Sequence, residues 1–102
     1  MRTSGGRFSI NFMKHQIEIP DDLADDTKRL VLSFAEALAA KLHAAEEKYG
    51  YDNGWMQTKW VKEGRCQKAL MEHIHKGDPR DVAAYCAFLW HHEASTTPVV
   101  KE

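Results

Sequence analysis

The stretch KGDPRD, residues Lys76–Asp81, lies between two segments that carry the apolar periodicity of a helix. Gly77 suits the left-handed residue that closes a helix. Asp78 is a favourable N-cap, and Pro79 fits the first position of the next helix. Asp81 stands three residues after the cap, near the positive end of the helix dipole. One helix therefore ends where the next begins, which predicts a tight helical hairpin.

Apolar side chains recur at steps of three and four residues in three segments, which predicts three helices. We expect the first helix over residues 23–49. The second follows the turn-forming residues 51–54 and runs to about His75, with a break near Gly64, because an internal glycine weakens a helix by about 1 kcal/mol relative to alanine. The third covers residues 79–93. The side chains expected to face the core are Leu30, Phe34, Leu38, Leu42, Ala45, Tyr49, Trp60, Cys66 or Gln67, Leu70, Met71, Ile74, Val82, Tyr85, Cys86, Leu89 and Trp90, with Phe88 on the flank.

These segments predict a single all-α domain, a small helical bundle in which a long first helix precedes a tight C-terminal hairpin. The length of 102 residues fits one domain. We divide the chain into a flexible N-terminal extension at residues 1–20, a helical domain at 21–93 and a flexible tail at 94–102. Because the short hairpin can cover only part of the long helix, we expect a second copy of the chain to complete the bundle as a homodimer.

The N-terminal extension differs in composition from the rest of the chain. Residues 1–12 are polar and glycine-rich at their start, and the segment from Met13 to Pro20 reads like a natural beginning. We therefore interpret residues 1–12 as an upstream extension. Residues 15–19 alternate polar and apolar side chains and could form an extended arm, although one such segment cannot make a sheet alone.

The overall charge and the cysteine content restrict the class of protein. A formal net charge of −1 and a pI near 6.6 give no global basic surface of the kind that binds nucleic acid non-specifically. The two cysteines, Cys66 and Cys86, are too few for a disulfide scaffold. No signal-peptide pattern and no membrane-spanning apolar run is present. We expect a soluble cytoplasmic protein with free thiols and no membrane partner.

Histidines and carboxylates give little support for a metal site. Two pairs of histidines lie near helix ends: His73 and His75 in the second helix, and His91 and His92 in the third. Within each pair the two side chains point in different directions, so they cannot both bind one ion from a regular helix. Such histidines suit the negative end of a helix dipole. The carboxylates that could bind Mg²⁺ as an alternative are Glu46, Glu47, Glu63 and Glu72. No ExxE or ExxD pattern falls on the second or third helix, so we predict no metal and no cofactor.

Aromatic and basic residues gather around one loop and form the strongest candidate for a binding surface. The residues that we expect to contact a partner are Tyr51, Trp55, Lys59, Trp60 and Lys62. Aromatic side chains beside lysines can recognise a protein or a nucleic acid. They can equally plug the end of a helical bundle, with lysine stems covering the rings. The two interpretations are compatible, because a plug can extend into an interface.

Part of the chain resembles a known group of proteins. Residues 44–51 (AAEEKYGY), Trp55 and residues 77–92 (GDPRDVAAYCAFLWHH) resemble small accessory proteins of lambdoid phages and prophages, over a region from Ala39 to His92. The amino-acid sequences of these segments are distinctive, but no activity is known for them.

At a greater distance, the helix-Gly-Asp-Pro-helix layout is similar to MazG-like all-α nucleoside triphosphate pyrophosphohydrolases. That family holds Mg²⁺ with an EExxE motif on one helix and an ExxD motif on the next. The second motif would fall near Ala84 and Ala87 here, and only Glu72 lies near the first. The resemblance therefore implies the fold and a dimer, and it argues against the reaction, because nothing would neutralise the charge on a transferring pyrophosphate.

The sequence as a whole favours a non-catalytic phage or prophage accessory protein. We expect it to bind a host macromolecule, in the first place a host protein of defence or nucleic-acid metabolism. One alternative is a divergent Mg²⁺-dependent nucleoside triphosphate pyrophosphohydrolase of the MazG-like class. Another is direct binding of nucleic acid through the lysine-rich second helix.

Overall fold

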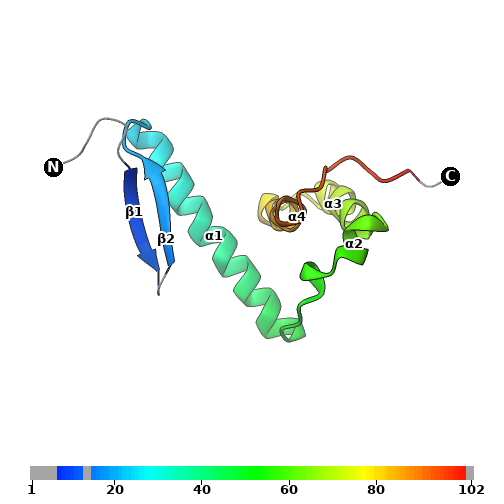
Figure 1. The fold of residues 1–102 in the computed structure, drawn as a ribbon. Helices are drawn as coiled ribbons and strands as arrows, with labels where there is room; N and C mark the ends of the chain where they lie inside the picture. The colour runs from blue at the N-terminus through cyan, green and yellow to red at the C-terminus, as the bar shows by residue number, and fades with distance from the viewer. Residues whose placement is uncertain (1–6, 13–14, 101–102) are drawn as a thin grey trace. The chain divides into compact units, whose positions relative to one another are not determined.

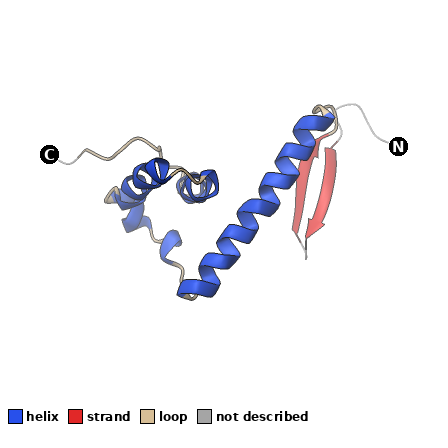
Figure 2. Ribbon diagram, turned by 180° about the vertical axis from the view of Figure 1, so that it is seen from behind, coloured by secondary structure: helices blue, strands red, loops and turns tan. Residues whose placement is uncertain are grey.

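The computed structural model describes the backbone of residues 7–12 and 15–100, and the side chains from residue 17 to residue 100 (Figure 1). Helices dominate this part of the chain, which confirms the predicted all-α class (Figure 2). The elements are β1 (Arg7–Phe12), β2 (His15–Pro20), α1 (Asp25–Tyr49), η1 (Gly54–Met56), α2 (Thr58–Lys62), α3 (Arg65–Lys76) and α4 (Pro79–His91). The chain divides into two compact units, one up to Ala35 and one from Glu36 onward.

The first unit contains an antiparallel hairpin that the sequence analysis did not predict. In its register Phe8 pairs with Ile19 and Ile10 pairs with Ile17. The flexible extension predicted over residues 1–20 is therefore corrected: the arm at 15–19 gains a partner strand in β1, which has the same alternation of polar and apolar residues. Residues 1–6, also part of that prediction, lie outside the described residues.

The connection from the hairpin into α1 is fixed by polar contacts. Ile19 is buried at the end of β2, and the backbone N–H of Leu23 donates to the Pro20 carbonyl at 3.2 Å. Lys28 Nζ donates to the Asp21 carbonyl at 2.8 Å. Asp25 and the residue after it occupy the first turn of α1, where carboxylates oppose the positive end of the helix dipole. The helix begins two residues later than predicted and ends at the predicted residue.

The predicted helical hairpin is present in the second unit. Gly77 closes α3 with a φ of 92°, the left-handed conformation that glycine adopts without strain. Asp78 caps α4, and its side chain accepts a hydrogen bond from the Arg80 backbone N–H at 2.9 Å. Pro79 occupies the first turn. The local rules that govern helix ends therefore place α4 directly after α3.

The core of the second unit lies between α2, α3 and α4. Its buried members are Val61, Cys66, Leu70 and Leu89, and half-buried side chains such as Trp60 pack around them. Cys66 has no exposed surface, and burial raises the pKa of its thiol to about 11. Both cysteines are free thiols, as the sequence predicted.

Gly64 breaks the predicted second helix. Its φ of +79° is left-handed, and it separates α2 from α3. A Cβ at this position would lie 2.9 Å from the Cβ of Val99. The C-terminal segment therefore approaches the helix break closely, and the Ser95 carbonyl accepts a hydrogen bond from Gln67 at 3.4 Å. The flexible tail predicted at residues 94–102 is corrected for these positions, because Ala94 also packs on the core. Residues 101 and 102 lie outside the described residues.

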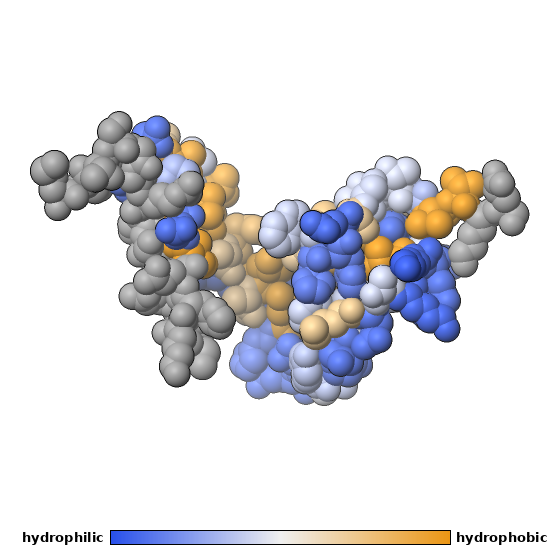
Figure 3. Space-filling model, viewed as in Figure 1, coloured by the Kyte–Doolittle hydropathy of each residue, from blue (hydrophilic) through white to orange (hydrophobic). Residues whose placement is uncertain are grey.

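Several residues that were predicted to face the core are exposed. Trp90 is 82% exposed, because it follows the buried Leu89 and a step of one residue turns a helical side chain by about 100°. On α3, Met71 and Ile74 are also exposed. The whole of α1 has no buried residue, and apolar side chains contribute surface along it (Figure 3). The exposed members of its predicted apolar face include Leu30, Phe34 and Tyr49.

Candidate partner-binding groove

A hollow of about 580 Å³ lies in the second unit, between the last turns of α1, the loop that follows, and α4. We call it the aromatic groove. Six of its lining residues carry aromatic rings. The lining residues are Leu42, Ala45, Glu46, Tyr49, Gly50, Tyr51, Asp52, Trp55, Trp60, Tyr85, Ala87 and Phe88.

Ring contacts with α4 hold the two tryptophans of the groove in place. The ring of Trp55 stacks on that of Phe88 with centroids 5.8 Å apart and planes 19° apart. The centroid of the Trp60 ring lies 5.8 Å from that of Phe88 and 6.2 Å from that of Tyr85. His92 Nε2 donates to the Trp55 carbonyl at 2.6 Å, which ties η1 to the end of α4. Aromatic pairs of this geometry stabilise by about 0.5–1.5 kcal/mol beyond the area they bury.

The structure brings together three of the five residues predicted to contact a partner. Tyr51, Trp55 and Trp60 line the aromatic groove, and the two tryptophans are only half-buried. Each ring therefore packs on α4 with part of its surface and leaves part open. The packed parts of the rings fit the predicted plug, and the open parts leave the recognition surface as a prediction.

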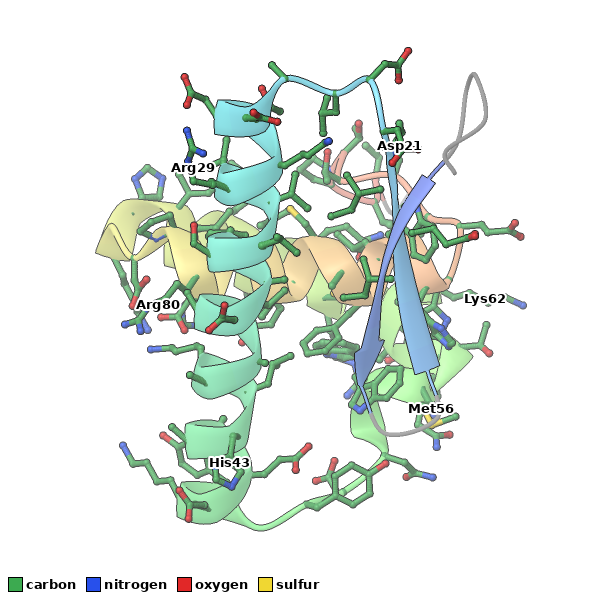
Figure 4. The ribbon with its side chains drawn as sticks, turned by 90° about the vertical axis from the view of Figure 1, so that its left-hand side faces the viewer. Asp21, Arg29, His43, Met56, Lys62 and Arg80 are labelled. Carbon is green, nitrogen blue, oxygen red and sulfur yellow. The ribbon has the colours of Figure 1, made fainter. Side chains whose placement is uncertain are left out.

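The two predicted lysines do not line the groove. Lys59 Nζ lies 3.7 Å from Glu63 Oε2, one turn along the helix, and its side chain is exposed. Lys62 projects outward from α2 (Figure 4). The two lysines are close to the tryptophans in sequence but lie outside the groove, because side chains at neighbouring positions on a helix point in different directions.

A second hollow, of about 520 Å³, adjoins the aromatic groove and is more polar. The two hollows share the side chains of Leu42, Ala45, Tyr49, Tyr85 and Phe88. Lys41 and Asp81 line the second hollow, and Lys41 Nζ lies 3.1 Å from Asp81 Oδ1 and 3.4 Å from Asp78 Oδ2. These ion pairs join α1 to the start of α4.

Charge and burial shift the pKa values of three groups near this hollow. Hydrogen bonds from Arg80, with a smaller contribution from Lys41, hold the pKa of Asp78 well below its usual range. The hydrogen bond to Asp81, followed by that to Asp78, raises the pKa of Lys41. Burial raises the pKa of Tyr85, and the Asp81 carboxylate adds to the effect.

His73 takes part in the same polar network. Its Nδ1 lies 3.6 Å from Asp81 Oδ2, and its Nε2 lies 3.4 Å from the Tyr85 hydroxyl. From the sequence, His73 was interpreted as a histidine near a helix end, Asp81 as part of a cap and Tyr85 as a core residue. Lys41 was not singled out. The contacts that join these four residues could not be predicted locally, because they link positions far apart in the chain.

We predict that the Asp78 carboxylate makes stability pH-dependent on the acid side. Because its folded-state pKa is depressed, the charge stabilises the fold above the unfolded pKa of about 4 and less as pH falls below that value. Asp78→Asn keeps an N-cap but removes the pairs with Lys41 and Arg80. Urea unfolding should show the variant less stable than the wild type at about pH 7, with a smaller difference at about pH 3.

The control for this experiment is Glu36→Gln, which removes an exposed carboxylate of α1. It should change stability little at either pH, because exposed charges contribute little. A constant difference between Asp78→Asn and the wild type at all pH values would contradict the prediction.

The four carboxylates considered for Mg²⁺ are not gathered at one point. Glu46 lines the aromatic groove, whereas Glu47 lies 3.9 Å from His43. Glu63 pairs with Lys59 and Arg65, and Glu72 is exposed on α3. Within residues 17–100, no group of three histidine, cysteine, aspartate or glutamate side chains is arranged to hold a metal ion.

Comparison of the chain with protein-family models, with curated proteins and with solved structures finds no match. Among the described residues, every helix is too short or too polar to cross a membrane.

Proposed function

We propose that this protein is a non-catalytic binding module that recognises a partner protein through the aromatic groove. The observation that carries the proposal is the convergence of Tyr51, Trp55 and Trp60 on one open hollow beside Tyr85 and Phe88. Tryptophan and tyrosine dominate the energetics of protein interfaces, because they bury much apolar area with few rotatable bonds. The rings of Trp55 and Trp60 are held by α4 before any partner arrives, which lowers the entropic cost of binding.

The resemblance of residues 39–92 to accessory proteins of lambdoid phages and prophages suggests where the partner comes from. We propose a protein of the bacterial host, one that acts in defence or nucleic-acid metabolism. This part of the proposal depends on the resemblance alone. The groove supports the binding activity without specifying the host process.

We predict that Trp55→Ala weakens partner binding at least about tenfold, the effect expected for an interface hot spot. The chain is used as bait in host lysate, captured proteins are identified by mass spectrometry, and the affinity of the purified partner is measured by calorimetry. Tyr51→Ala removes a ring that is 62% exposed and serves as a second variant if Trp55→Ala unfolds. Trp90→Ala, outside the groove, is the matched control. Full-strength binding by both groove variants would refute the proposal.

A second candidate is the Mg²⁺-dependent nucleoside triphosphate pyrophosphohydrolase. One observation favours it: the aromatic groove adjoins a hollow lined by Lys41, Lys48 and His73, so rings for a base lie next to cationic groups for phosphates. Lys41 is already paired with two carboxylates, which weakens that argument. Pyrophosphate release from a panel of nucleoside triphosphates with Mg²⁺ tests it, and release would displace the non-catalytic proposal.

Direct binding of nucleic acid is a third candidate. The exposed lysines Lys59, Lys62 and Lys68 lie on α2 and α3, outside the aromatic groove. Binding through them would neutralise phosphates and release counterions. A steep fall of affinity with rising salt would identify this mode, and a salt-independent affinity for the partner protein would favour the groove.

We also propose that the protein is a homodimer whose contact includes α1. No residue of α1 is buried, and exposed apolar side chains follow one another at Leu30, Val31 and Phe34. A long helix without a fully buried residue gains little stability from propensity alone, because most helical stability in proteins comes from packing an apolar face. A second copy presents the same apolar face, so the contact can be self-complementary.

A further inference from the structure

The aromatic groove carries carboxylates and no basic side chain among its lining residues. The carboxylates are Glu46, from the last turns of α1, and Asp52, from the loop that follows. This composition differs from the sequence-based expectation, in which lysines surrounded the tryptophans. The groove is therefore suited to a cationic group, whereas a phosphate or a carboxylate would meet like charges.

Lys48 and Arg65, two basic side chains near the groove, make other contacts. Lys48 Nζ lies 5.1 Å from the centroid of the Tyr49 ring, and Lys48 lines the second hollow, not the groove. Arg65 lines a neighbouring hollow that shares Asp52, Trp55 and Trp60 with the groove, and its Nε lies 3.0 Å from Glu63 Oε1. Neither side chain neutralises the two groove carboxylates by a contact in the described chain.

Two structural features add to the attraction for a cation. Asp52 Oδ1 accepts the Gly54 backbone N–H at 2.8 Å, so the carboxylate is held in place before a ligand binds. The groove is also lined by Tyr49 and Gly50, the residues at which α1 ends. The C-terminal end of a helix carries the equivalent of about −0.5 elementary charge, which favours a cation there.

We propose that the aromatic groove binds an arginine side chain presented by the partner protein. This inference rests on the proposed binding function and names the chemistry of the partner. A guanidinium is planar, so it stacks on tryptophan and tyrosine faces while its edge donates to a carboxylate. Trp55, Trp60 and Tyr51 supply the faces, and Glu46 and Asp52 supply the acceptors. A lysine ammonium matches only the charge.

The test uses the full ¹⁵N-labelled chain and two blocked peptides, glycine–arginine–glycine and the same peptide with citrulline. Citrulline has the shape of arginine without its charge. Titration with the arginine peptide should shift the indole N–H signals of Trp55 and Trp60, and the citrulline peptide should bind at least about fivefold more weakly. A lysine peptide and a glutamate peptide complete the series, with lysine weaker than arginine and glutamate without effect.

Substitutions in the groove locate the site. Glu46→Gln and Asp52→Asn should each weaken binding of the arginine peptide about three- to tenfold, because each removes one charge-assisted acceptor. Asparagine at position 52 still forms the turn. The matched control is Glu47→Gln, on the same turn of α1 but outside the groove, which should bind like the wild type.

The outcomes separate this inference from the proposed function. Equal binding of the arginine and citrulline peptides, stronger binding of the glutamate peptide, or equal losses in Glu46→Gln and Glu47→Gln would each overturn the arginine site. If Trp55→Ala still abolishes capture of the partner while Glu46→Gln and Asp52→Asn leave that capture unchanged, the binding function stands and the arginine site fails. If Trp55→Ala, Glu46→Gln and Asp52→Asn all lose capture of the partner while Glu47→Gln retains it, the result supports both the binding function and the arginine site.

Discussion

Replacement of Leu89 by alanine should lower the free energy of unfolding by about 2–5 kcal/mol. Leu89 is 1% exposed and is the largest side chain that is completely enclosed in the second unit. It packs with Val61, Cys66 and Leu70, so truncation leaves a cavity between three helices. Native domains are stable by only about 5–15 kcal/mol, and a loss of this size removes a large share of that margin. Urea unfolding followed by circular dichroism measures it.

The adjacent residue provides the control for this prediction. Trp90→Ala removes a larger side chain, but Trp90 is 82% exposed, so stability should change by at most about 0.5 kcal/mol. Equal losses from the two substitutions would mean that α4 packs with a different face. The comparison also tests the rotation of α4 directly, because the sequence alone assigned both residues to the core.

Local rules explain why the α3–α4 hairpin was predictable. Gly77 and Asp78 each have a conformational or hydrogen-bonding preference that depends only on near neighbours, and the structure satisfies both preferences. The same holds for Gly64, whose left-handed φ separates α2 from α3. Glycines and caps act over a few residues, so their effect can be derived without knowing the rest of the fold.

Tertiary contacts were harder to derive from the chain. The pairing of Lys41 with Asp81 joins residues on different helices, and no local pattern signals it. The strand β1 was missed because a strand needs a partner, and the alternation in Arg7–Phe12 has meaning only when His15–Pro20 lies beside it. Helical rotation explains another error, since Leu89 and Trp90 were both predicted to face the core but only Leu89 is buried.

For the candidate site, sequence proximity identified the aromatic rings but not the charge around them. Trp55 and Trp60 are close in the chain to Lys59 and Lys62, and this suggested a basic surface. In the structure the rings turn toward α4, and the groove takes its charge from Glu46 and Asp52 instead. The sign of the charge in a site depends on which elements surround the site. It could therefore not be predicted from the sequence of the one helix that carries the lysines.

Phe34→Glu should convert the proposed homodimer into a monomer at micromolar concentration. Phe34 lies on α1 among the exposed apolar side chains Leu30 and Val31. In a two-fold contact the substitution appears twice, and each buried carboxylate without a partner costs several kcal/mol. Light scattering coupled to size-exclusion chromatography should then report the 11.7 kDa of one chain for the variant and twice that mass for the wild type.

The matched control is Ser33→Glu, one residue earlier on the same turn. Ser33 is exposed, and its hydroxyl donates to the Leu30 carbonyl at 3.3 Å, so its side chain already serves the helix itself. A step of one residue rotates the new charge by about 100° from the position of Phe34, off the apolar face. The control should therefore remain dimeric. A wild-type chain that is monomeric at the same concentration, or dimers in both variants, would contradict a contact through this face of α1, because a self-complementary apolar contact cannot accept two unpaired charges at its centre.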